Sequence, residues 1–169
     1  MKVDISELKE NRNASMELSF LEPVTLIKIG GEEITFNGPA SVELFISNDT
    51  DFFTIYGSVS VEAFLRCSRC LKVFTFPLKG TIEAQYRQVS PGYEGIEDAD
   101  LKVFNGNEID VTSDIKEGLI LSLPVKAVCF EECKGLCPTC GKDLNKGKCE
   151  CKIEDIDPRL AVLKDLLKE

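Results

Sequence analysis

The chain contains eight cysteines, which fall into four close pairs, and thiols spaced in this way can bind a metal ion or take part in redox chemistry. In chain order these are Cys67 with Cys70 (first pair), Cys129 with Cys133 (second), Cys137 with Cys140 (third), and Cys149 with Cys151 (fourth). Zinc favours four thiolates in a tetrahedron, and a Cys-x-x-Cys turn lets two sulfurs of one turn bind the same ion. Because the chain contains no histidine, any zinc site here must be rich in thiolates.

Eight thiolates divide into two sets of four, so we expect one or two zinc ions, with two favoured. The third and fourth pairs are the nearest complements, separated by the loop at 141–148. By elimination, the first pair would then join the second and connect two distant parts of the chain. Two alternatives stay open. The partner pairs could be exchanged between the sites, or the span from Cys137 to Cys151 could hold a single ion while the first pair stays as free thiols.

Structural zinc is the interpretation we favour, because four thiolates leave no coordination position for a reactive water. A redox Cys-x-x-Cys needs a low-pKa thiol at a helix N-terminus, whereas Cys67 and Cys70 lie between two strand patterns. An iron–sulfur cluster ranks third, since the spacings match none of the usual ferredoxin patterns. Without histidine, Ser-His and Cys-His catalysis are excluded, and we predict no catalytic residue and no enzyme.

Two long strands must position the first pair. The odd positions of residues 53–65 and the even positions of residues 74–86 are apolar or small, which predicts two half-buried strands. A four-residue tip at 67–70 would pair Ala63 with Phe74 and place the apolar side chains of both strands on one face.

The same alternation continues upstream, at 40–46, with a turn expected at 48–51. The alternation over residues 39–87 therefore predicts a three-stranded antiparallel meander. Pro77 indicates an edge or a bulge in the third strand, because proline cannot donate to the ladder. A shorter hairpin is expected over 24–36, around a pair of glycines.

The rest of the chain completes an α+β fold: mainly antiparallel β, as a meander sheet or partial barrel, with two short helices and a Cys-rich zinc-binding segment. We expect an acidic loop at 88–102 and an extended piece at 103–111. One helix should open at Thr112-Ser113-Asp114 and bury Ile115, Leu119, Ile120 and Leu123 before Pro124; the other should open at Asp157-Pro158 and bury Leu160, Leu163, Leu166 and Leu167. The expected domains are a β-sheet domain at 1–111 and, at 112–169, a helix and the cysteine cluster with the C-terminal helix packed on it.

The overall charge narrows the classes of partner. Twenty Lys and Arg against 29 Asp and Glu give a formal charge of -9, which disfavours a protein that binds nucleic acid through a broad basic surface. A charged N-terminus without a signal-peptide pattern, and no apolar run near the roughly 18 residues of a membrane span, predict a cytoplasmic protein. In that compartment paired cysteines more often hold metal than form disulfides.

Basic residues nevertheless gather near the cysteines. The candidate partner contacts are Arg66, Arg69 and Lys72 around the first pair, and Lys142, Lys146 and Lys148 in the distal segment. These side chains either contact RNA or merely offset the thiolate charge, and the two interpretations have equal weight. The acidic sheet would suit a basic partner protein through charge complementarity.

Four short motifs carry a family resemblance. They are Arg66-Cys67-Ser68-Arg69-Cys70-Leu71 followed by Phe74, Leu121-Ser122-Leu123-Pro124, Cys133-Lys134-Gly135-Leu136-Cys137-Pro138-Thr139-Cys140-Gly141, and Asp157-Pro158-Arg159-Leu160. In their order and spacing the chain resembles the YceD family, the large ribosomal RNA subunit accumulation proteins of bacteria and plastids. The resemblance implies a non-enzymatic role in the synthesis, processing or stability of large-subunit ribosomal RNA.

We therefore expect a ribosomal protein or assembly factor as partner, with ribosomal RNA as a further candidate, and neither a membrane nor a small-molecule substrate. One alternative is a zinc-ribbon regulator that binds nucleic acid. It should carry a basic recognition helix, and neither predicted helix is basic. The less favoured alternative is a thiol-disulfide protein.

Overall fold

The computed structural model describes residues 1–11, 13–24, 26–49, 52–89 and 101–151. Its strands are β1 (Lys2–Asp4), β2 (Ser15–Glu22), β3 (Leu26–Ile29), β4 (Glu32–Phe36), β5 (Ala40–Asp49), β6 (Phe52–Arg66), β7 (Val73–Gln88), β8 (Leu101–Phe104) and β9 (Glu108–Asp110). The described part also has two helices, α1 (Ser6–Glu10) and α2 (Thr112–Leu121). The predicted class, mainly antiparallel β with a Cys-rich segment, is confirmed.

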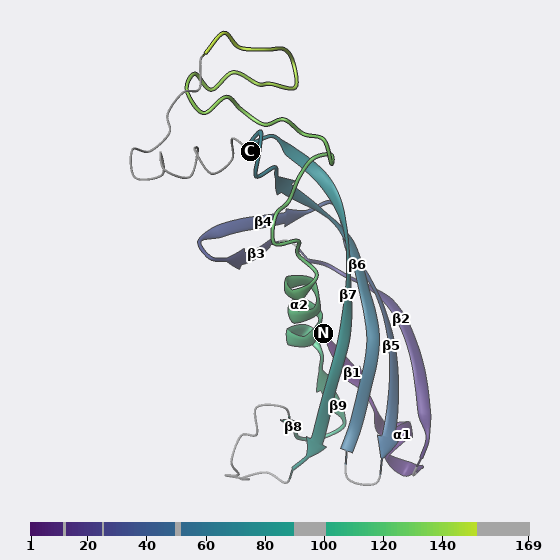
Figure 1. Cartoon of the computed structure of the whole chain (residues 1–169). Helices are drawn as coiled ribbons and strands as arrows, with labels where there is room; N and C mark the ends of the chain where they lie inside the picture. Colours follow the sequence, from purple (N-terminus) through teal and green to yellow (C-terminus); the bar gives the residue numbers. More distant parts are fainter. Residues whose placement is uncertain (12, 25, 50–51, 90–100, 152–169) are drawn as a thin grey trace, which may run out of the picture.

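Strands β2 to β8 form one open, seven-stranded sheet, and β1 pairs with β9 in a second, two-stranded sheet. Strands β2, β5, β6 and β7 lie side by side in that order and make the curved body of the large sheet (Figure 1). The predicted hairpin over 24–36 is confirmed as β3 and β4, and Thr35 and Phe36 join it to β6. β8 pairs with the end of β7 alone, so Pro77 lies on an edge of β7 that no described strand covers, as expected.

The predicted meander of β5, β6 and β7 is confirmed, but its predicted register is wrong by two residues. Ala63 lies opposite Phe76 rather than Phe74. Pairing continues to Arg66, so the turn that carries the first cysteine pair spans residues 67–72 and is longer than predicted. Because side chains alternate with a period of two, a slip of two residues leaves each of them on its predicted face.

The predicted turn at 48–51 is also wrong, because Asn48 is a buried strand residue. Strands β5 and β6 extend further than expected and leave only residues 50–51 between them. The side-chain amide of Asn48 donates to the carbonyl oxygen of Leu8 at 2.6 Å, and its backbone N–H donates to that of Ala14 at 3.0 Å. These bonds satisfy a buried polar group and connect β5 to helix α1 and to the start of β2.

Helix α2 packs on the inner face of the sheet, the face that carries the buried alternate residues (Figure 1). Two glycines permit the close approach: a Cβ atom placed on Gly80 would lie 2.2 Å from the carbonyl oxygen of Gly118. Ile115 and Leu119 are buried against the sheet, as predicted. The predicted burial of Ile120 is wrong, because this residue is 39% exposed.

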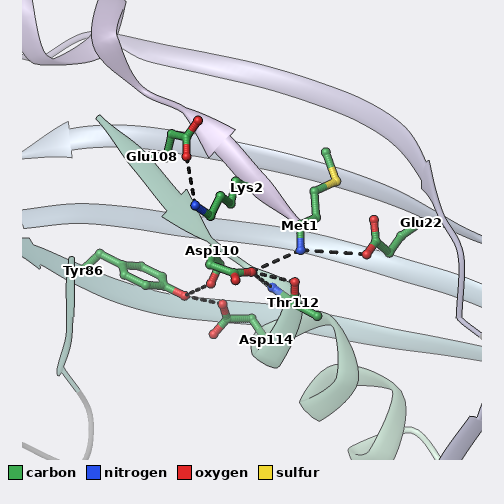
Figure 2. Close-up of polar contacts among 8 residues, drawn as sticks. All are labelled: Met1, Lys2, Glu22, Tyr86, Glu108, Asp110, Thr112 and Asp114. Carbon is green, nitrogen blue, oxygen red and sulfur yellow. Dashed lines mark hydrogen bonds and ion pairs between the residues drawn. The ribbon is translucent and has the colours of Figure 1, made fainter. Parts of the chain in front are cut away.

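The predicted start of α2 at Thr112 is confirmed, but the side chain that accepts hydrogen bonds at this end of the helix is Asp110, two residues earlier. Its carboxylate accepts from the backbone N–H of Thr112 at 3.0 Å, from the Thr112 hydroxyl at 2.6 Å and from the amino group of Met1 at 3.1 Å (Figure 2). These donors, Thr112 foremost, hold the pKa of Asp110 well below its usual range.

A buried polar cluster connects α2 to β7 and β8. The hydroxyl of Tyr86 donates to the buried carboxylate of Asp114, which also accepts from Lys102 Nζ (Figure 2 shows the Tyr86 bond). Burial, and next the Asp114 carboxylate, raise the pKa of Tyr86 well above its usual range. Tyr86 therefore stays a neutral hydrogen-bond donor, and Asp114 is satisfied as a buried charge must be.

Two predictions fall largely or wholly outside the described residues: the acidic loop, apart from its two ends, and the C-terminal helix that should open at Asp157. The domain boundary between 111 and 112 stays a prediction. Within the described residues, no helix has the length and apolar character needed to cross a membrane.

Candidate metal centre

The first cysteine pair lies in a tight turn at the end of β6 and β7. The backbone N–H of Cys67 donates to the carbonyl oxygen of Lys72 at 2.8 Å, and that of Leu71 donates to Cys67 at 2.9 Å. Leu71 has a φ of 60°, in the left-handed region that leucine rarely adopts. This closed turn aims both thiols of the pair at one point and explains why the register of β6 and β7 differs from the prediction.

The third cysteine pair repeats this turn bond for bond. Cys137 donates to the carbonyl oxygen of Lys142 at 2.8 Å, and Gly141 donates to that of Cys137 at 2.9 Å. Gly141, at the position that Leu71 holds in the first turn, has a φ of 70°. The two turns are therefore structural equivalents, although only the first ends a hairpin of the large sheet.

The structure gathers the eight cysteines into two groups of four. The proximal group is Cys67, Cys70, Cys129 and Cys133, and the distal group is Cys137, Cys140, Cys149 and Cys151. Within each group the sulfur atoms all lie within 4.8 Å of one another. These are the sets that sequence reasoning reached by elimination, with neither exchanged partner pairs nor unpartnered first-pair thiols.

The sulfur spacing fits a tetrahedral ion. In the proximal group the Sγ atoms of Cys67 and Cys133 are 3.9 Å apart, and those of Cys70 and Cys129 are 3.6 Å apart. Four sulfurs at about 2.3 Å from a zinc ion would stand about 3.8 Å from one another. A disulfide would need about 2.05 Å, and all eight cysteines are free. Each group could therefore hold one metal ion.

The two groups share one electrostatic pattern, in which one thiol of each favours the thiolate. Burial opposes ionisation of Cys67, but the backbone N–H groups of Cys70, Cys129 and Arg69 outweigh it and lower the Cys67 pKa to about 6. The corresponding N–H groups of Cys140 and Thr139 lower the Cys137 pKa to about 6. Turn amides that face a sulfur stabilise its negative charge.

The opposite shift occurs at one thiol of the second pair and one of the fourth. Burial, and next Cys70, raise the pKa of Cys129 to about 12. Contact with Cys140, followed by burial, raises the pKa of Cys151 to about 12. Four thiolates cannot ionise together at such short range unless a cation compensates them, which is the condition a divalent ion would meet.

Arg69 connects the first turn to the chain around Cys133. Its guanidinium donates to the carbonyl oxygens of Glu131 at 3.0 Å and Cys133 at 2.8 Å. Its own carbonyl oxygen accepts from Leu136 at 3.1 Å. Gly135 passes so close that a Cβ atom there would lie 2.8 Å from the Arg69 carbonyl oxygen. Arg69, predicted as a partner contact, therefore makes intramolecular bonds.

The segment 143–145 connects the two groups. Lys72 Nζ lies 3.1 Å from a carboxylate oxygen of Asp143, and the side-chain amide of Asn145 lies 3.4 Å from Cys133 Sγ. The carbonyl of the same amide accepts from the backbone N–H of Lys134 at 2.8 Å. Sequence reasoning missed Asp143 and Asn145. Their spacing is that of a local turn, since Asp143 accepts from the Asn145 backbone, but nothing in it indicates the contact with the proximal group.

The other predicted contact residues differ in whether their side chains bond within the chain. Arg66, Lys146 and Lys148 are exposed, while Lys142 donates to the backbone carbonyl of Lys148 at 2.9 Å. Near Arg66, a groove of about 750 Å³ opens between the β3–β4 hairpin, the first turn and residues 123–127. Its lining includes the exposed Leu71. Sequence reasoning did not predict this groove.

Sequence comparison with known proteins identifies relatives of this chain. The chain is 34% identical over 113 residues to an uncharacterized protein, YlbN, of Bacillus subtilis, a match that covers 66% of this chain and 64% of that relative. An uncharacterized protein of Mycobacterium tuberculosis is 28% identical over 176 residues, covering 99% of this chain and 81% of its own. No solved structure matches the chain.

A third relative carries a functional name. The chloroplastic "Large ribosomal RNA subunit accumulation protein YCED homolog 1" of Arabidopsis thaliana is 37% identical over 62 residues, which are 37% of this chain and 19% of that protein. The sequence profile described as "Large ribosomal RNA subunit accumulation protein YceD" matches residues 55–167. That match spans most of the chain and both cysteine groups, and on it the chain belongs to the YceD family.

Proposed function

We propose that this protein is a non-enzymatic, zinc-binding factor of the cytoplasm that supports the synthesis, processing or stability of large-subunit ribosomal RNA. The observation that carries the proposal is the presence of two groups of four cysteines, each with its sulfur atoms within 4.8 Å of one another, in a chain that matches the YceD profile. The printed name of the plant relative describes accumulation of large-subunit ribosomal RNA, and we extend that role to this chain.

Zinc is the metal we assign to both groups, with all eight cysteines as ligands. Tetrahedral sets of four sulfurs suit zinc, and a structural site closed by four thiolates has no place for a substrate or a reactive water. In this role the proximal ion would join the turn between β6 and β7 to the segment after α2, and the distal ion would close the loop between Cys137 and Cys151. The chemistry that zinc supplies here is the neutralisation of clustered thiolates and the stabilisation of the fold.

The partner we propose is a ribosomal protein or an assembly factor, with ribosomal RNA as the other candidate and no small-molecule substrate. Exposed Arg66, Lys146 and Lys148 are available for a partner, whereas Arg69 and Lys72 already make intramolecular bonds. A regulator that reads DNA bases is less well supported, because α2 carries Lys116 as its one basic residue.

Two experiments test this function. Depletion of the protein from its own cells should lower large-subunit ribosomal RNA relative to small-subunit RNA, and an unchanged ratio would exclude the role. Affinity capture with the zinc-loaded protein, with and without ribonuclease, should retain the same ribosomal protein or factor in both samples. If every captured protein is lost after ribonuclease, the direct partner is RNA.

A further inference from the structure

One face of the large sheet is open in the described structure. Alternate residues of β2, β5, β6 and β7 point away from the core, and we call their central part the outer face: Glu17, Ser19, Leu21, Ser41, Glu43, Phe45, Tyr56, Ser58, Ser60, Lys79, Thr81 and Glu83. Helix α2 and the β3–β4 hairpin lie on the opposite, inner face (Figure 1). Among the described elements, none covers the outer face.

A row of four side chains crosses this face. The strand registers place Glu17 opposite Phe45, Phe45 opposite Tyr56, and Tyr56 opposite Glu83. Phe45 is 40% exposed and Tyr56 is 47% exposed, which is unusual for two adjacent aromatic residues in the middle of a sheet. With strands about 4.8 Å apart, the backbones at Glu17 and Glu83 stand about 14 Å from each other, with Phe45 and Tyr56 between them.

The charges of the outer face are acidic and uncompensated. Glu43 lies two residues before Phe45 on the same strand, so three carboxylates surround the aromatic pair. In the described residues Glu17, Glu43 and Glu83 take part in no ion pair. Lys79 is the one cation among the outer-face residues named above, and Arg87, further along β7 on the same side of the sheet, already lies over the Phe52 ring. Nucleic-acid phosphates would be repelled here, whereas lysine and arginine would be attracted.

The aromatic pair adds a second reason to expect cations. The face of an aromatic ring attracts an ammonium or a guanidinium group. The same sheet already makes one such contact, because the guanidinium of Arg87 lies 4.6 Å from the ring centre of Phe52. Phe45 and Tyr56 have no cation of this kind in the described structure.

We propose that the row Glu17, Phe45, Tyr56 and Glu83, with Glu43 beside it, binds an extended cationic segment of a partner protein. Alternate residues of an extended chain point to one side, so lysine or arginine at every second position would reach both the carboxylates and the rings. This inference rests on the proposed function and names the chemistry of its partner: a protein segment rich in lysine and arginine, docked on the outer face and away from the cysteine groups.

The direct test uses a defined probe. A fluorescent, extended peptide of about twelve residues, with arginine at every second position, is titrated with the zinc-loaded full-length protein at low and at physiological salt. An anionic peptide of equal length and a single-stranded RNA of similar length serve as comparison probes. The cationic peptide should bind with an affinity that falls as salt rises, and the other two should bind at least about tenfold more weakly.

Matched variants locate the binding. The double variant Glu17→Lys/Glu83→Lys should weaken peptide binding about tenfold or more, while Glu7→Lys/Glu10→Lys, with the same change in net charge on α1, should not. Phe45→Thr/Tyr56→Thr should weaken binding without any change in charge, and threonine preserves strand propensity. Circular dichroism and zinc content establish that each variant is folded. Equal losses in the two charge variants, or none in the row variants, would overturn the inference.

The same variants separate this inference from the proposed function. In cells depleted of the native protein, the α1 control variant should restore the ratio of large- to small-subunit ribosomal RNA, and the row variants should not. If the row variants restore it fully, the outer face is not the docking surface, although the proposed function stands. If depletion leaves the ratio unchanged, the proposed function fails whatever the peptide result.

Discussion

Lys72 Nζ lies 3.1 Å from a carboxylate oxygen of Asp143, in an ion pair that joins the turn of the proximal group to the loop of the distal group. Asp143 also accepts from the backbone N–H of Asn145, and this bond, followed by the one from Lys72, holds the Asp143 pKa below its usual range. The amide of Asn145 in turn lies 3.4 Å from Cys133 Sγ. The distal loop therefore supplies a hydrogen bond to a sulfur of the proximal group.

From this contact we predict that Asn145→Ala weakens metal binding at the proximal group. Outer contacts to metal ligands commonly contribute 10–100-fold in affinity, and we expect roughly tenfold here because one neutral bond is lost. Competition with a chromophoric zinc chelator measures the effect. Lys146→Ala, which changes an exposed neighbour, is the control and should lose zinc to the chelator as the wild type does. Equal release from both variants would assign Asn145 a purely local role.

Cys67→Ser and Cys137→Ser should each lose about one equivalent of zinc, because each removes one ligand from a different group of four. Elemental analysis of the purified proteins gives the stoichiometry. Ser68→Ala, in the same turn as Cys67, should retain both ions. The Cys137 variant should also release its remaining ion faster, since the loop that holds Asn145 loses its anchor. Retention of both ions by either cysteine variant would contradict the two-site proposal.

Gly80→Ala should lower the free energy of unfolding by roughly 1–3 kcal/mol, because the added methyl would overlap the carbonyl oxygen of Gly118 and push α2 from the sheet. Urea denaturation checks this value. Gly147→Ala is the matched control: a Cβ atom there meets nothing within 4 Å, so its stability should stay near that of the wild type. A neutral Gly80→Ala would mean that helix and strand can separate without cost.

In the two equivalent turns, adding a glycine at Leu71 and removing the glycine at Gly141 should change the stability of the protein in opposite directions. Leu71→Gly should stabilise the protein by about 1 kcal/mol, because leucine at a φ of 60° is strained. Gly141→Ala should destabilise it by a similar amount, since the φ there is 70° and no packing is gained. Thermal melting of both zinc-loaded variants provides the comparison. If Leu71→Gly is instead destabilising, the contacts of Leu71 in its groove outweigh its backbone strain.

The raised pKa of Tyr86 predicts a loss of stability in alkali. A tyrosine whose pKa is higher in the folded than in the unfolded state stabilises fully below the unfolded value of about 10, and this contribution falls as pH rises above it. Tyr86→Phe should be less stable at neutral pH by about 1–3 kcal/mol, because Asp114 loses a donor. The difference from wild type should shrink above pH of about 10. A constant difference across denaturation curves at rising pH would contradict the assigned pKa shift.

Much of the fold follows from local pattern. Period-two alternation identified β5, β6 and β7 and their buried faces, and the glycine pair marked the β3–β4 hairpin. Alternation could not determine the register of β6 and β7, because a slip of two residues keeps every side chain on its face. That slip is the error observed at Ala63. Residue type and the end of the alternation at 46 predict a turn at Asn48. Its place inside β5 depends on a bond to Leu8, which is remote in the sequence.

The chemistry of the candidate site follows from the sequence: eight cysteines, no histidine, and turns that present sulfurs in pairs. These are properties of residue type and short spacing. The three-dimensional fold was needed to show which pairs meet, how Asn145 reaches Cys133, and that Phe45 and Tyr56 stand between Glu17 and Glu83. Each of these depends on strand register or loop packing between distant segments, which the free energy of the whole fold selects and no local pattern records.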